Sequence, residues 1–327
     1  MSNLERDPQE APCGGLADVA TEPVNELLIG RDVVLGGTRG MKVTRTLPNR
    51  DIRMVGAWCF VDHYGPEKAT MRVPPHPHTG LQTVSWLLAG EVTHRDSVGS
   101  EQVVRPGQLN LMTAGRGISH SEHSPAAVEL HGVQLWVALP AAARGIAPAF
   151  EHHPSLPVLT SPGVRVTVIM GELGGATSPA TVHTPLVGAE VVLDAGAEVV
   201  LPLRPGFEYA ALALSGSVRV DGTDLAPGPL LYLGSGRSEL SLAAGPGGRV
   251  LLLGGEPFEE EIVMWWNFVG RSHEEIVRFR REWMAGSAFG AAPGTDDPFG
   301  VVPGTDDPAL PAPELPTTPL KARGRHR

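Results

Sequence analysis

Cysteine is almost absent from this chain of 327 residues, which contains only Cys13 and Cys59. Two cysteines 46 positions apart provide neither a disulfide framework nor a thiolate metal site with CxxC spacing. Long apolar runs are also lacking, since no stretch of 18 apolar residues occurs and the acidic N-terminus has no apolar signal segment. These absences predict a cytoplasmic protein with no membrane partner.

Aromatic residues and positive charges are scarce as well. Aromatic residues make up 5% of the chain, and 26 Lys and Arg stand against 36 Asp and Glu, which gives a net charge of -10. A net negative field repels phosphate backbones, so we expect no direct contact with nucleic acid. The chain is instead rich in Gly (40) and Pro (31), a composition typical of a globular fold with many turns.

Short apolar runs predict an all-β fold. From about residue 26 to 255 such runs alternate with Gly and Pro turn signals spaced roughly 8 to 12 residues apart. This spacing is typical of jelly-roll β-barrels. The length of the chain predicts two such barrels in tandem.

A faint internal repeat supports two copies of one β unit. The sequence before Gly90 resembles the sequence before Gly216. When these glycines are aligned, Pro202 and Arg204 stand where the first copy has two histidines. We therefore expect the second barrel to lack the metal ligands considered below.

The chain divides into four predicted segments and one predicted helix. Ser272 to Glu275 form a capping box, and Ile276, Phe279 and Trp283 share one helical face. We expect a disordered arm (1–25), a metal-binding barrel (26–150), a second barrel (151–286) that includes the helix (272–285), and a disordered Pro- and Gly-rich tail (287–327).

Two pairs of polar residues in the first unit have the spacing of a metal site. His76 and His78 are two residues apart, as are His120 and Glu122. Side chains at i and i+2 of a strand point to the same face, so each pair can reach one cation. Three neutral imidazoles and a carboxylate suit Fe(II), Mn, Ni or Cu. The alternative is that these residues are hydrogen-bonded core or surface groups.

Several stretches of the chain resemble the pirin family, bicupins of the cupin superfamily. The stretches are 62–66, 76–80, 94–99 and 112–122, and the resemblance extends from about Arg31 to Gly286. The resemblance implies that iron is bound by His76, His78, His120 and Glu122. These are the same four residues that the spacing argument proposes. Fe(II) is then the expected ion, with Mn, Ni, Cu or Zn as alternatives.

Three further residues are candidates for positions around the metal. Pirins commonly have Glu where this chain has Gln82, and the neutral amide would remove a negative charge near the metal. His63 and His94 occupy settings similar to those of the family. Each either supports the ligands, contacts the substrate, or is a hydrogen-bonded histidine at a strand end.

The resemblance implies two functions of different classes. Some pirins open the central ring of flavonols such as quercetin with molecular oxygen and release carbon monoxide. Others bind a transcription factor or a metabolic enzyme in an iron-dependent manner. We expect the dioxygenase, with Glu122 as the base that takes the flavonol proton, and keep the redox-sensing partner protein as the alternative.

Overall fold

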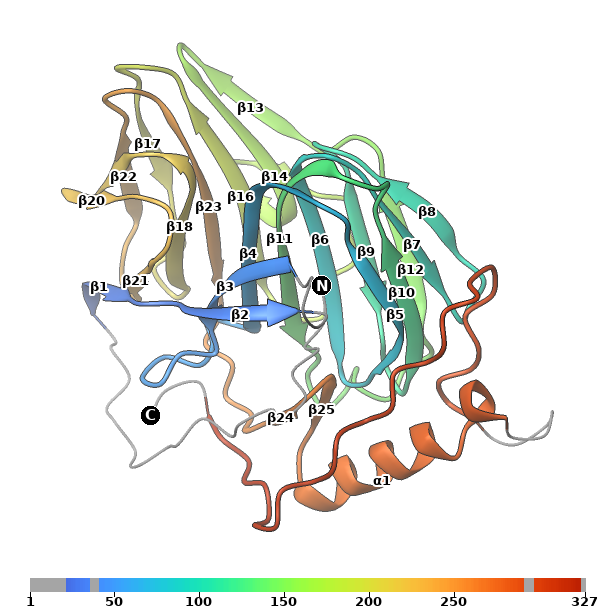
Figure 1. Cartoon of the computed structure of the whole chain (residues 1–327). Coiled ribbons are helices and arrows are strands. Elements are labelled where there is room, and N and C mark those ends of the chain that lie inside the picture. The colour runs from blue at the N-terminus through green and yellow to red at the C-terminus, as the bar shows by residue number, and fades with distance from the viewer. Residues whose placement is uncertain (1–21, 36–40, 291–296, 325–327) are drawn as a thin grey trace.

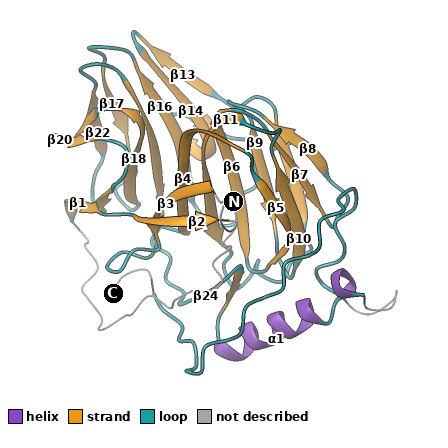
Figure 2. Cartoon of the chain, viewed as in Figure 1, coloured by secondary structure: helices purple, strands orange, loops and turns teal. Residues whose placement is uncertain are grey.

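The computed structural model describes residues 22–35, 41–290 and 297–324. In this part of the chain strands predominate, and the one α-helix lies beside the first of two β units (Figures 1 and 2). No helix within these ranges is long and apolar enough to cross a membrane. The predicted all-β architecture of two tandem barrels is confirmed.

The first unit consists of a seven-stranded and a four-stranded antiparallel sheet. The larger sheet has the order β12-β9-β6-β11-β4-β3-β2, with β2 (Arg31–Leu35), β3 (Met41–Leu47), β4 (Trp58–Ala69), β6 (Leu81–Ala89), β9 (Leu109–Thr113), β11 (Val128–Ala138) and β12 (Ala149–His153). The smaller sheet has the order β5-β10-β7-β8, with β5 (Arg72–His78), β7 (Val92–Asp96), β8 (Glu101–Val104) and β10 (Ile118–His123).

The second unit repeats this arrangement. Its larger sheet has the order β1-β21-β18-β23-β16-β14-β13, with β1 (Pro23–Leu28), β13 (Val158–Ser161), β14 (Val164–Leu173), β16 (Leu186–Leu193), β18 (Glu208–Gly216), β21 (Leu230–Gly234) and β23 (Gly248–Gly255), and β15 (Ala176–Thr177) pairs with β14. Its smaller sheet has the order β17-β22-β19-β20, with β17 (Glu198–Pro202), β19 (Val218–Val220), β20 (Thr223–Leu225) and β22 (Glu239–Ala243).

The two strand orders match position by position, as the faint sequence repeat predicts. Strand β17 occupies the place of β5, and Gly90 and Gly216 both have positive φ, +84° and +68°, at the ends of equivalent strands. Pro202, the last residue of β17, pairs with Glu239 of β22. The second barrel therefore has no histidines where β5 and β10 carry theirs.

The boundaries between the units differ from the predicted ones. Strand β1 begins at Pro23, within the predicted arm, and pairs with β21 of the second unit rather than with the first barrel. Strand β12 ends at His153 and still pairs with β9 of the first unit. Both pairings are non-local, so local sequence patterns do not reveal them. The rest of the predicted arm, residues 1–21, lies outside the described residues.

The two units share one apolar core across their larger sheets. Along β18, Ala210, Leu212 and Leu214 belong to a cluster shared with the first unit, whereas Tyr209 and Ala211 face the interior of the second barrel. Because side chains alternate along a strand, each large sheet buries both faces. The two barrels therefore pack against each other through a shared apolar core.

After the second unit, a hairpin of β24 (Val263–Trp265) and β25 (Phe268–Gly270) leads into α1 (His273–Met284). The hydroxyl of Ser272 accepts a hydrogen bond from the Glu275 amide at 3.3 Å, and Ile276 and Trp283 are buried. The predicted helix and its cap are confirmed. A short 3-10 helix, η2 (Ser287–Phe289), follows.

The prediction of a disordered tail is wrong for residues 297–324, which we call the C-terminal strap. The strap lies beside α1 and the edge of the first barrel, although it has almost no regular secondary structure (Figure 2). Phe299 is fully buried, and Val302, Ala312 and Leu320 are also buried. The apolar residues of the strap have no periodicity, but Phe299, Ala312 and Leu320 pack in one cluster with the buried face of α1. Composition alone therefore indicated disorder where the chain is packed.

Candidate metal centre

Strand β5 carries two of the predicted ligands. In the His76-Pro77-His78 sequence both histidines point to the same face and are fully buried. The prolines of this strand are tolerated because β5 is the edge strand of its sheet. The carbonyl of Pro74 lies 2.8 Å from Nδ1 of His76 and can only accept a hydrogen bond. Nδ1 of His76 is therefore the protonated nitrogen, and Nε2 is the nitrogen with the lone pair.

Strand β10 brings the other pair to the same place. His120 pairs in register with His76 of the adjacent strand, and Glu122 follows after a register shift. Nε2 of His120 lies 3.1 Å from Nε2 of His78. The hydroxyl of Ser85 donates to a carboxylate oxygen of Glu122 at 3.4 Å, which places Glu122 inside the same barrel.

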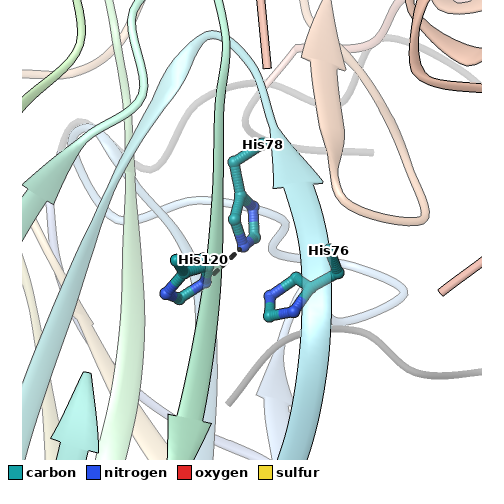
Figure 3. A group of neighbouring side chains, drawn as sticks. All are labelled: His76, His78 and His120. Atoms are coloured by element: carbon teal, nitrogen blue, oxygen red, sulfur yellow. Dashed lines mark hydrogen bonds between the residues drawn. The ribbon is translucent and has the colours of Figure 1, made fainter. Parts of the chain in front are cut away.

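The three histidines converge on one point (Figure 3). One ligand nitrogen from each of His76, His78 and His120 lies within 4.8 Å of the others. Burial lowers the pKa of His76 to about 4, and burial together with the neighbouring histidines lowers the pKa of His78 and His120 well below the ordinary value. All three rings are therefore neutral at pH 7, the form that binds metals.

This donor set fits a metal ion. Two ligand atoms that lie about 2.1 Å from one ion at right angles are about 3.0 Å apart. The separation of 3.1 Å between the Nε2 atoms of His78 and His120 agrees with that value. Three neutral imidazoles beside a carboxylate also match the preference of Fe(II), Mn, Ni, Cu and Zn for nitrogen and oxygen ligands.

His94, predicted as one of the surrounding residues, lies directly against this cluster. It pairs in register with Glu122, and its Nδ1 is 3.2 Å from Nδ1 of His120. His94, His120 and Glu122 form a second group whose ligand atoms lie within 4.8 Å of one another. The cluster therefore includes one more histidine than the spacing argument assigned.

Asp96 and Phe150 complete the surroundings of His94, and the sequence argument assigned no role to either. The ring of Phe150 stacks on His94 with centroids 4.5 Å apart, and Oδ2 of Asp96 accepts from Nε2 of His94 at 3.0 Å. His94 and Asp96 have the same i, i+2 spacing that identified the ligand pairs, so that rule would have found Asp96. Phe150 comes from β12, whose pairing with β9 is non-local.

The other two candidates, His63 and Gln82, are not brought to the cluster. Nε2 of His63 lies 3.0 Å from Nε2 of His131. His131 in turn forms a hydrogen bond with the backbone of Leu214 in the second unit. The Gln82 amide donates to Thr113 and to the carbonyl of Thr181 at 2.9 and 3.1 Å. Since Ser85 on the same regular strand faces Glu122, Gln82 faces the opposite side. The expected loss of charge beside the metal does not occur, because this position faces the second unit.

Comparison with known proteins identifies the family. A model of the pirin domain matches residues 40–137, and a model of the pirin C-terminal cupin domain matches residues 188–290. Mouse pirin is 33% identical over 245 residues, which cover 72% of this chain and 84% of that protein. The chain belongs to the pirin family.

Two more similar proteins have quercetin dioxygenase in their names. This pirin is 47% identical over 283 residues to a Pseudomonas aeruginosa protein that is named provisionally as a quercetin 2,3-dioxygenase, covering 85% of this chain and 89% of that protein. It is 41% identical to a quercetin 2,3-dioxygenase from Acinetobacter baumannii of known crystal structure, with a TM-score of 0.83, covering 91% of this chain and 97% of that one.

The two family matches separate the barrel that carries the candidate metal ligands from the barrel that has none. The candidate ligands all lie within the first match, whereas the second match begins inside β16, covers the later strands of the barrel that lacks them and extends through α1. The C-terminal strap lies outside both matches.

Proposed function

We propose that this pirin is an iron-dependent dioxygenase that opens the central ring of flavonols such as quercetin and releases carbon monoxide. The observation that carries the proposal is the buried cluster of three neutral histidines with Glu122 beside it. Relatives named as quercetin 2,3-dioxygenases support the substrate class.

In this proposal His76, His78, His120 and Glu122 hold the ion, with Fe(II) expected. When bound, the metal supplies Lewis acidity toward the flavonol 3-hydroxyl and adjacent carbonyl, and redox chemistry toward oxygen. In this proposal Glu122 also accepts the proton of the 3-hydroxyl, because it is the carboxylate of the proposed ligand set. Trp136 and Phe150, which contact His78 and His94, provide apolar walls that exclude water.

The test measures oxygen consumption and carbon monoxide release with quercetin on protein of known iron content. His76→Ala should lose metal and turnover together, whereas His183→Ala, outside the cluster, should retain both. Turnover in proportion to iron would support the dioxygenase. Fully iron-loaded protein that neither binds nor consumes any flavonol would exclude it.

One observation favours the alternative, an iron redox sensor that binds a protein partner. His76, His78 and His120 are each 0% exposed, and a sensor needs no substrate access to its metal. A change between Fe(II) and Fe(III) would alter the buried charge by one and shift the surface between two states. Amide hydrogen exchange that is identical for the two oxidation states would contradict this function.

The cytoplasmic location remains a prediction.

A further inference from the structure

The C-terminal strap touches the two ligand-bearing strands immediately beside their histidines. The amide of Leu310 donates to the carbonyl of Pro75 at 2.8 Å, and Pro75 directly precedes His76. The amide and hydroxyl of Ser119 donate to the carbonyl of Phe299 at 3.1 and 3.0 Å. Ser119 directly precedes His120. The strap therefore constrains the backbone at one residue before two of the three histidines.

The third histidine is held from the same side through β25. The amide of Val269 donates to the carbonyl of Thr79 at 3.1 Å, and Thr79 directly follows His78. Phe268, the neighbour of Val269, packs against Phe299 of the strap with ring centroids 5.9 Å apart. All three histidines are thus flanked by contacts with the C-terminal part of the chain. In Figure 1 this part of the chain passes beside the first barrel.

The strap is anchored independently of these contacts. Phe299 is buried among aromatic rings that include Trp283, whose indole N–H donates to the carbonyl of Leu310 at 2.8 Å. Asp307 forms an ion pair with Arg72 at the start of β5, and its other carboxylate oxygen lies 2.9 Å from Nε2 of His123 at the end of β10. The strap is therefore fixed to α1 on one side and to both strands on the other.

We propose that the C-terminal strap braces the ligand-bearing strands, so that docking of the strap and metal binding strengthen each other. Strand β5 is an edge strand, and the strap supplies an amide donor on its open side. A metal site requires ligand positions fixed to a fraction of an ångström, so any loss of backbone constraint lowers affinity. Coupling between two binding events is reciprocal, so the metal must in turn stabilise the docked strap. The inference rests on the proposed metal centre and not on flavonol chemistry.

The first test compares Leu310→Pro with Leu310→Ala in the full-length protein. Both variants lose the side chain, but only proline loses the N–H that donates to Pro75. Competition with a chelator for anaerobic Fe(II), and separately for Ni(II), should show affinity at least fivefold weaker in Leu310→Pro than in Leu310→Ala. Equal affinities would overturn the inference. The thermal unfolding of the metal-free variants establishes that both are folded.

A second pair of variants tests the contacts of Asp307 in the same way. Asp307→Asn removes the charge that faces Arg72 and His123, whereas Asp306→Asn removes the same charge from an exposed neighbour. We expect weaker metal binding in Asp307→Asn and unchanged binding in Asp306→Asn. A decrease of equal size in both variants would show a general charge effect and contradict the brace.

The reciprocal measurement is amide hydrogen exchange of the wild-type chain with and without Ni(II). Bound metal should slow the exchange of strap amides, including Leu310, and leave β20 in the second barrel unchanged. Metal binding that leaves strap exchange unchanged would overturn the brace alone. Absence of turnover with quercetin, when both effects are present, would overturn only the dioxygenase. Failure to bind any metal would overturn both.

Discussion

At the residue scale, a chain of hydrogen bonds sets which nitrogen of His120 faces the metal centre. Oδ1 of Asp96 accepts from the amides of Val98 and Ser100 at 3.1 and 2.9 Å, so its carboxylate is fixed. Oδ2 of Asp96 lies 3.0 Å from Nε2 of His94 and can only accept, so this nitrogen carries a proton; in the tautomer that has its single proton there, Nδ1 of His94 accepts from Nδ1 of His120. Nε2 of His120 then carries the lone pair and faces His78. His94 is therefore a positioning residue for a ligand.

We expect His94→Leu to weaken metal binding by roughly 10-fold or more, because His120 loses the acceptor that fixes its tautomer. His94→Gln should recover part of this loss, since its amide oxygen can accept from His120 while its NH2 group donates to Asp96. Chelator competition measures both, with His183→Leu as a control outside the cluster. Affinity in His94→Gln as low as in His94→Leu would show that His94 acts through packing on Phe150 instead.

At the element scale, local sequence signals predicted the helix, whose formation depends on interactions between residues close together in the chain. The capping box and the spacing of Ile276 and Trp283 gave the helix within one residue at each end, because capping and amphipathicity act within a few residues. The pairing of β1 with β21 and the packing of the strap were not predicted. The pairing of β1 and the contacts of the strap with β5 and β10 depend on partners about 200 residues away along the chain, which no local pattern encodes.

The helix cap makes a measurable contribution to stability. Ser272→Ala removes the acceptor for the Glu275 amide and should lower the free energy of unfolding by about 1 kcal/mol. Ser272→Asp retains an acceptor at the same position and should lose much less. Urea denaturation of the metal-free proteins measures the difference. Equal losses in the two variants would contradict a capping role.

At the scale of the whole molecule, the contact between the two units explains which site residues the sequence could identify. The ligand pairs were predictable because a period of two places both members on one face of one strand. The positions of His63 and Gln82 were not predictable. The large sheet is buried on both faces, so a polar residue on one of its strands can face either the barrel interior or the second unit. His63 lies against His131 where the second unit supplies the backbone of Leu214. Family-like sequence thus marks the contact between units as well as the metal centre.

This contact should make the stability of the molecule depend on pH. Burial, and then the neighbouring His131, lower the pKa of His63 to about 4 in the folded protein, against about 6.5 in an unfolded chain. Between these values the unfolded chain binds a proton that the folded chain does not, so the free energy of unfolding falls as the pH falls.

His63→Gln removes this titration and retains a hydrogen-bonding side chain opposite His131. From pH 7.5 to 5, the variant should lose about 2 kcal/mol less of its free energy of unfolding than the wild type does. Urea denaturation of metal-free protein at each pH measures the difference, and comparison with the wild type cancels the titration of the other histidines. His183→Gln, outside the contact between units, should follow the wild-type curve. Parallel curves for wild type and His63→Gln would show that the low pKa of His63 does not contribute to folding, and the contact between the barrels would then be insensitive to pH.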